Sequence, residues 1–130
     1  MARVFGIIQV GRKRLRTLFD SEVTNCFISA EAANGLPKTT LKFPRPGNFG
    51  GKPCVATEVC LLAGKLEGHY LDSGAYVLDE VGKDDQGRPI DLVVGVLGMR
   101  QWNIVLVPEE GRLDLSHFTK EFIEFAGGTW

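Results

Sequence analysis

One carboxylate in the sequence stands where an acid could do chemistry. Asp20 ends the apolar run Leu18-Phe19, and a second apolar run begins at Cys26, shortly after Ser21. An ionised side chain between two buried segments costs desolvation free energy, so it must be hydrogen-bonded or have a catalytic task. We interpret Asp20 as a candidate catalytic residue. The alternative is an aspartate that caps a turn after a strand, which is common in β proteins.

The cysteines and histidines do not form a metal or nucleophile pattern. Cys26, Cys54 and Cys60 are an odd number of thiols at spacings that fit neither a zinc site nor a disulfide framework, so we expect them to be reduced. His69 and His117 lie far apart, without a Cys-x-x-Cys or His-x-x-x-His pair. We therefore predict no metal site. We interpret Cys26 as a small buried side chain, because a cysteine nucleophile needs a histidine partner.

Composition argues against several classes of partner. The chain has 130 residues, enough for one domain with a real core, and its 15 basic and 16 acidic residues leave a net charge of -1. Its short basic cluster, Arg12-Lys13-Arg14, follows Gly11 and is predicted to be a solvated hairpin tip, so we expect no nucleic-acid partner. A run of about 18 apolar residues and a signal-peptide layout are both lacking, so we expect no membrane anchor.

The first half of the chain predicts a hairpin, a short helix and a glycine-rich loop. Residues 4–10 are apolar and β-branched, and after the turn at Gly11 a second strand delivers Asp20 at its C-terminal end. Residues 29–35 predict a short helix with Ser29 as its N-cap. Residues 39–53 are rich in proline and glycine, which is typical of a slack connection or a mobile cover, and Phe49 would be an exposed aromatic at its tip.

The second half repeats this layout loosely, because it again gives strands, an apolar-to-small junction and a short helix. We expect strands at 55–62, 69–78, 90–95, 103–107 and 112–115, turns at 64–68 and 108–111, a polar loop at 82–89, and a helix at 96–102. The tail, residues 116–130, has helical spacing. A repeated half suggests pseudo-symmetry within the subunit.

Two motifs in this order resemble those of the retroviral-protease-like (retropepsin-like) aspartic peptidases. The first is apolar-apolar-Asp-Ser/Thr-Gly, here Leu18-Phe19-Asp20-Ser21-Glu22. The second is apolar-apolar-Gly before a short helix, here Val93-Val94-Gly95. The resemblance spans roughly residues 4–115, and the loop 47–51 falls where the family keeps its flap.

The resemblance implies an all-β, mainly antiparallel fold. It would be a closed acid-protease barrel with one or two short helices, the single-domain subunit of a homodimer. Residues 1–115 would form the retropepsin-like domain, with its flap at about 41–56, and 116–130 would be a C-terminal tail.

The resemblance also implies an aspartic endopeptidase that cleaves peptide substrates with activated water and no cofactor or metal. Each subunit would supply one aspartate, so the active site would lie across a two-fold axis. Two carboxylates held close together cannot both ionise cheaply and would share a proton. The implied site consists of the catalytic Asp20, the supporting loop residues Ser21, Glu22, Val23 and Thr24, and the flap residues Phe49, Gly50 and Gly51.

Glu22 departs from the family pattern, which has glycine at this position so that backbones can approach closely. This departure keeps a second hypothesis open, in which the chain is a catalytically impaired pseudoprotease that acts as a peptide-binding or dimerisation module. A rival signature, Asp72-Ser73-Gly74-Ala75, contains the glycine that the first lacks. Only 22 residues separate Asp72 from Val94, too few for a flap and its following strands, so we expect an exposed turn or bulge there.

Overall fold

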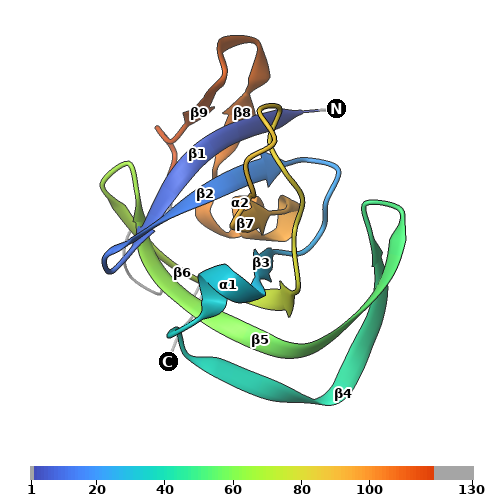
Figure 1. Ribbon diagram of the computed structural model, residues 1–130. Coiled ribbons are helices and arrows are strands. Elements are labelled where there is room, and N and C mark those ends of the chain that lie inside the picture. The colour runs from blue at the N-terminus through green and yellow to red at the C-terminus, as the bar shows by residue number, and fades with distance from the viewer. Residues whose placement is uncertain (1, 119–130) are drawn as a thin grey trace, which may run out of the picture.

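The computed structural model describes residues 2–118 of the chain (Figure 1). In chain order the elements are β1 (Arg3–Val10), β2 (Lys13–Asp20), β3 (Phe27–Ser29), α1 (Ala30–Ala33), β4 (Lys38–Phe49), β5 (Lys52–Leu66), β6 (His69–Leu78), β7 (Leu92–Val94), α2 (Val96–Trp102), β8 (Val105–Val107), a 3-10 helix (Pro108–Glu110) and β9 (Arg112–Asp114). Within these residues no helix is long and apolar enough to span a membrane.

Seven of the strands described pair in the order β1-β2-β7-β3-β6-β5-β4, and β8 pairs with β9 in a separate small sheet. β1 also pairs with β5, through Ile8 opposite Leu66 and Gln9 opposite Lys65, so the pairing returns to its first strand. Only β2–β7 and β3–β6 are parallel. The predicted all-β, mainly antiparallel fold with short helices is therefore confirmed.

The hairpin that carries Asp20 follows from its residue pattern. Alternate residues of β1 are buried, namely Val4, Ile8 and Val10, as expected for a strand with one face on a core. β2 is covered on both faces, because Phe19 packs in the larger core cluster and Leu18 in the smaller one. Asp20, the last residue of β2, therefore follows directly on residues that are packed on both faces of the strand.

The predicted glycine- and proline-rich loop is largely a strand. β4 pairs with β5 from Arg45 opposite Ala56 to Phe49 opposite Lys52, and the register shifts between Thr40 and Arg45. Gly50 and Gly51 turn the hairpin with φ of +60° and +81°, the left-handed backbone that a two-residue hairpin turn needs. The expectation of a loop over residues 39–53 was wrong, because backbone pairing between β4 and β5 outweighs the loop preference of the prolines and glycines.

Other element boundaries also differ from those expected. β5 continues to Leu66, so the predicted turn at 64–68 shrinks to Glu67 and Gly68, and the predicted strand at 90–95 is a strand only over β7. The α2 helix has the predicted bounds. The short helix α1 is capped as predicted, with the Ser29 hydroxyl accepting a hydrogen bond of 3.1 Å from the Ala32 amide. The helical expectation for the tail concerns mainly residues 119–130, which lie outside the residues described.

A buried aspartate fastens the long connection between β6 and β7 to β2. Asp84 accepts hydrogen bonds of 2.9 Å from the amides of Gln86 and Arg88, and it pairs with the Arg88 guanidinium at 3.0 Å and with Arg16 of β2 at 3.5 Å. Burial opposes ionisation of this carboxylate, but the two amides and the Arg88 guanidinium outweigh it and lower the pKa of Asp84.

We predict that Asp84→Asn lowers the melting temperature at pH 7 and that the difference fades in acid. A carboxylate whose pKa is lower in the folded state stabilises the fold above its unfolded pKa of about 4, and this stabilisation is lost as the pH falls through the folded value. Thermal unfolding followed by circular dichroism between pH 7 and pH 3 measures the effect. Asp85→Asn, at the exposed next position, is the control, and equal losses in the two variants would contradict the prediction.

Candidate active site

The two sequence motifs meet at one edge of the sheet. β2 and β7 pair in parallel, with Leu18 opposite Val93 and Phe19 opposite Val94. The next residues along the two strands, Asp20 and Gly95, therefore leave the sheet side by side. The two motifs are neighbours in the fold, although they lie more than 70 positions apart in the sequence.

The loop after Asp20 is bound directly to the start of α2. The amide of Val96 donates to the Val23 carbonyl at 2.7 Å, and the amide of Leu97 donates to the Thr24 carbonyl at 3.1 Å. The first amides of a helix have no partner within the helix, so the loop carbonyls satisfy them and are themselves fixed.

Gly95 is required by this contact. A Cβ at this position would lie 2.5 Å from the Asn25 carbonyl oxygen and 2.6 Å from the carbonyl of Thr24. Both are backbone atoms, which cannot move aside as the end of a flexible side chain can. The second motif therefore needs glycine at position 95, because the loop of the first motif packs directly against its backbone.

Asp20 is both a turn residue and an accessible acid. Its Oδ1 accepts a hydrogen bond of 2.9 Å from the Glu22 amide, and its carbonyl accepts one of 3.3 Å from the Val23 amide. Its Oδ2 lies 3.9 Å from Nε of Arg3, the residue opposite on β1, and the side chain is 13% exposed. The turn-capping interpretation thus describes the geometry correctly. In the residues described, only Oδ1 accepts a backbone hydrogen bond, and Oδ2 accepts none.

The supporting loop residues have different surroundings. The Ser21 hydroxyl accepts from the Ala2 amide and donates to the Ala2 carbonyl, each at 3.2 Å, so it ties the loop to the start of the chain. Val23 is half-buried against the smaller core cluster, whereas Glu22 and Thr24 are exposed. No cation among residues 2–118 pairs with the Glu22 carboxylate.

The β4–β5 hairpin, which we call the flap, carries the predicted residues Phe49, Gly50 and Gly51 at its end. The two glycines form its exposed turn. Phe49 is half-buried, with its ring 5.0 Å from that of Phe27, which in turn lies 6.1 Å from Tyr76. The exposed position expected for Phe49 was wrong, because the strand alternation turns it toward β3 and β6.

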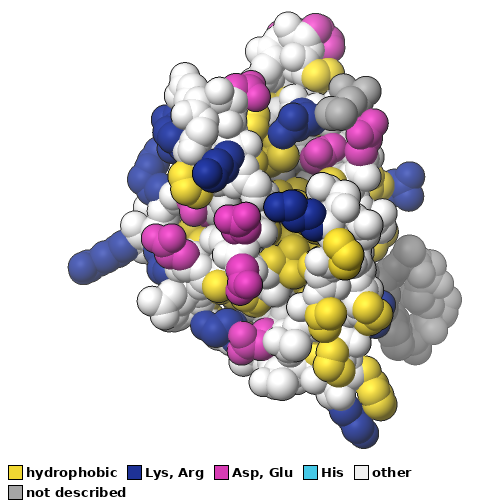
Figure 2. All heavy atoms as spheres, turned by 45° about the vertical axis from the view of Figure 1, so that its right-hand side comes forward, with side chains coloured by type: hydrophobic (Ala, Val, Ile, Leu, Met, Phe, Trp, Pro, Cys, Tyr) yellow, Lys and Arg dark blue, Asp and Glu magenta, His cyan; other side chains and the backbone are white. Residues whose placement is uncertain are grey.

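A groove of about 250 Å³ lies between the flap and the body of the molecule. Its walls come from the loop after Asp20, from β3 and β6, and from both flap strands: Asn25, Phe27, Arg45, Pro46, Gly47, Asn48, Cys54, Ala56, Tyr76 and Leu78. Asp20 is not one of these residues, and Asn25 is the residue of its loop that lines the groove. Figure 2 brings this side of the molecule forward and shows hydrophobic side chains gathered along its lower right and in a hollow next to them.

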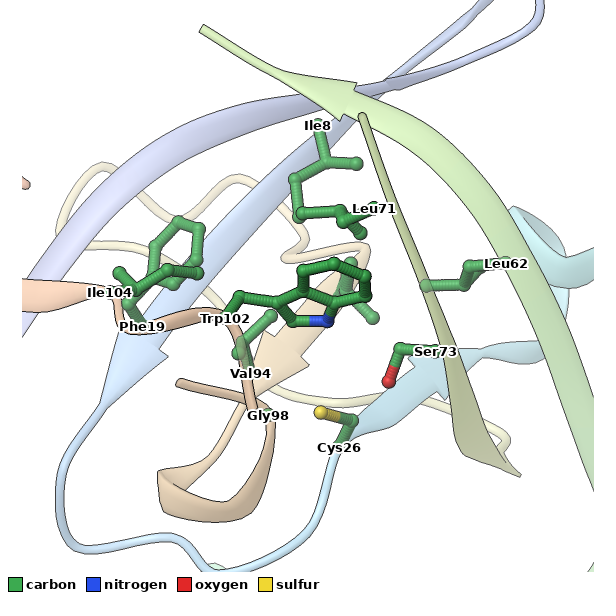
Figure 3. A pocket seen from close by; sticks show the side chains of 11 residues that line it. Ile8, Phe19, Cys26, Leu62, Leu71, Ser73, Val94, Gly98, Trp102 and Ile104 are labelled. Carbon is green, nitrogen blue, oxygen red and sulfur yellow. The ribbon is translucent and has the colours of Figure 1, made fainter. Parts of the chain in front are cut away.

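A second, internal cavity of about 20 Å³ lies in the core, about the volume needed for one water molecule. Figure 3 shows the Trp102 indole nitrogen pointing toward Ser73 and Cys26 across it. This nitrogen is buried and has no hydrogen-bond partner among the residues described. Burial raises the pKa of the Cys26 thiol, and the hydrogen bonds with Gly95, Ser73 and Gly98 only partly offset this. The thiol stays protonated, as expected of a buried side chain rather than a nucleophile.

The remaining candidate groups do not form a site. Asp72 is exposed in the middle of β6, opposite Ala63, so it is not held at a strand end as Asp20 is. The exposed turn or bulge expected for the rival signature was wrong, because its residues lie in β6, with Asp72 and Gly74 exposed, Ser73 half-buried and Ala75 buried. Burial raises the pKa of the Cys60 thiol. Within residues 2–118 no cluster of three or more histidine, cysteine or acidic residues could hold a metal ion.

Sequence reasoning missed three residues that the structure brings to this region. Arg3, Asn25 and Arg45 line or approach the site. Arg3 could have been found from the hairpin itself, because a two-residue turn at Gly11-Arg12 fixes Arg3 opposite Asp20. Arg45 could not, because its position depends on the register of β4 against β5.

Comparison with known proteins identifies the fold. No protein-family model matches the chain, and no curated protein matches its sequence. Among solved structures, the chain is similar to the retroviral protease-like domain of Ddi1 from Leishmania major, with a TM-score of 0.58, 14% identity, and 91% of each chain covered. At this identity the likeness concerns the fold alone. The chain therefore has a retropepsin-like fold, in agreement with the predicted fold class.

We predict that Gly95→Ala destabilises the protein by about 1–3 kcal/mol, the usual cost of forcing a methyl group into a filled site. The added Cβ would push the loop 21–25 away from α2. Urea unfolding followed by tryptophan fluorescence measures the change in the free energy of unfolding.

Gly47→Ala is the matched control for this experiment. Gly47 also lacks a positive φ, but the nearest atom to an added Cβ would be the Cys54 sulfur at 3.9 Å, an ordinary contact. Equal stability of the two variants would show that the close approach at Gly95 is not the constraint.

Proposed function

We propose that the chain is one subunit of a homodimeric aspartic endopeptidase that hydrolyses peptide bonds of an extended substrate lying beneath the flap. The observation that carries the proposal is the parallel register of β2 and β7. It sets Asp20 beside Gly95, while α2 fixes the loop between Asp20 and Cys26. Asn25 of that loop and residues of both flap strands line one groove.

In the proposed reaction the Asp20 side chains of two subunits face each other and share one proton. The ionised carboxylate takes a proton from a water molecule, which attacks the carbonyl carbon of the scissile bond. The protonated carboxyl donates a hydrogen bond to the carbonyl oxygen and stabilises the negative charge that develops there. The proton taken from water then passes to the leaving amine, and the two acids exchange roles. No cofactor is needed.

The residues around Asp20 suit this task. The Glu22 amide fixes one carboxylate oxygen through a hydrogen bond of 2.9 Å, which leaves the other oxygen to be directed at water or substrate. The Ser21 hydroxyl and amide secure the loop on Ala2. Positioning of this kind lowers the barrier because the acids need not reorganise during the reaction.

A second candidate function is a peptide-binding or dimerisation module that does not cleave. Glu22 favours it, because this exposed residue brings a Cβ and a negative charge to a position where the family has glycine. A third acid close to a pair that must share a proton adds like charge.

We predict that Asp20→Asn reduces cleavage of a peptide library by about 10²- to 10⁴-fold, because an amide cannot serve as the acid or base. Mass spectrometry of the digested library reads the cleavage, and sedimentation equilibrium checks that the variant still forms the expected dimer. Asp72→Asn is the matched control and should cleave normally. Full activity of Asp20→Asn, or a monomer that cleaves, would refute the assignment.

We predict that Glu22→Gly raises kcat/KM by about tenfold or more, equivalent to lowering the barrier by at least about 1.4 kcal/mol. The change removes both the side chain and its charge from the loop. Glu22→Gln separates these two effects, because it keeps the side chain and removes only the charge. Should Glu22→Gly gain no pepstatin-sensitive cleavage over an inactive parent, the non-cleaving module is favoured.

A further inference from the structure

The flap presents one arginine to the groove. Side chains alternate between the two faces of a strand, so Arg45, Gly47 and Phe49 share one face of β4. Phe49 packs on Phe27 of β3, which identifies this face as the inner one. Arg45 lies opposite Ala56, which is buried in the smaller core cluster, and both residues line the groove.

Arg45 has no carboxylate partner in the part of the chain that the structure describes. Arg3, Arg16, Arg88 and Arg112 each have an acidic side chain within 4 Å, with Asp20, Asp84, Asp84 and Glu110 respectively. No carboxylate among residues 2–118 lies that close to the Arg45 guanidinium. The groove lining contains no aspartate or glutamate, so the charge of Arg45 is not neutralised from within the groove.

The other polar groups of the groove fit the same kind of ligand. Asn25 also lines it, and its side-chain amide can donate hydrogen bonds, whereas the side chain of Asn48 alternates to the other face of β4. A planar guanidinium with amide donors nearby matches the two oxygens of a carboxylate. The aromatic rings of Phe27 and Tyr76 complete the wall and limit the access of water to a bound group.

We propose that Arg45 makes the groove selective for peptides that carry an aspartate or glutamate side chain. The inference rests on the proposed function only in taking the groove as the place where peptide binds. Since Asp20 does not line the groove, the selected acidic residue lies to one side of the scissile bond and not at it.

The test measures binding and cleavage separately. Fluorescent ten-residue peptides, identical except for one glutamate or glutamine moved along the sequence, are titrated onto the full chain carrying Asp20→Asn, which prevents cleavage during the titration. At one or more positions the glutamate peptide should bind about tenfold more tightly than its glutamine match, because a charged hydrogen-bonded pair is stronger than a neutral one. The same peptides are digested with the unaltered chain.

Charge reversal assigns the preference to one side chain. In the same background, Arg45→Glu should abolish the glutamate preference and favour a lysine at that position. Lys42→Glu is the matched control, because Lys42 lies on the same strand but stacks over the Phe43 ring and does not line the groove. It should leave the preference unchanged.

The outcomes separate this inference from the proposed function. Equal affinities at every position, absence of binding, or loss of the preference in both charge-reversal variants overturns the inference, even when the unaltered chain cleaves the peptides. A glutamate preference that depends on Arg45, without cleavage, supports the inference and contradicts the endopeptidase.

Discussion

The close approach of Gly95 to the backbone of Thr24 and Asn25 is the constraint on which the site depends. Two chain segments far apart in sequence touch without a side chain between them, and two hydrogen bonds from α2 secure the contact. The parallel pairing of β2 with β7 brings the segments to the same edge. The backbone around Asp20 is therefore fixed both by the β2–β7 pairing and by the contact of its loop with α2. Such a backbone can hold the carboxylate in one orientation.

Turn formation and acid chemistry are compatible roles for Asp20. The hydrogen bond from the Glu22 amide satisfies one oxygen and lowers the cost of placing a carboxylate at the edge of two core clusters. It also orients the group, as the proposed chemistry requires. Within residues 2–118 the charged neighbour of Asp20 is the cation of Arg3 and not a second acid. The proposed reaction therefore requires a second copy.

The elements that depend on local pattern could be predicted from the sequence, and those that depend on long-range pairing could not. Alternation in β1, the Ser29 cap and the bounds of α2 follow from neighbouring residues. The motif pair also predicted the retropepsin-like fold. By contrast, the prolines and glycines of β4 indicated a loop, and only its ladder with β5 makes it a strand. Phe49 and Arg45 were misplaced or missed for the same reason, since their orientation follows from that ladder.

Asp20 and the arginine of the groove lie on different parts of the fold, and this separation bears on the proposed function. The candidate acid rests on β2 and β7, whose side chains pack in the two core clusters, whereas the groove's charged group rests on an exposed hairpin whose register shifts next to it. Substitution of an exposed flap residue such as Arg45 can change which peptides are held without disturbing the loop of Asp20, whereas the flap residues Ala56 and Phe49 belong to the same core cluster as Val23 of that loop. Glu22 is the exception, since it lies on the acid's own loop and faces solvent. In the proposed function, catalysis and peptide selectivity would thus depend on different residues of one small chain.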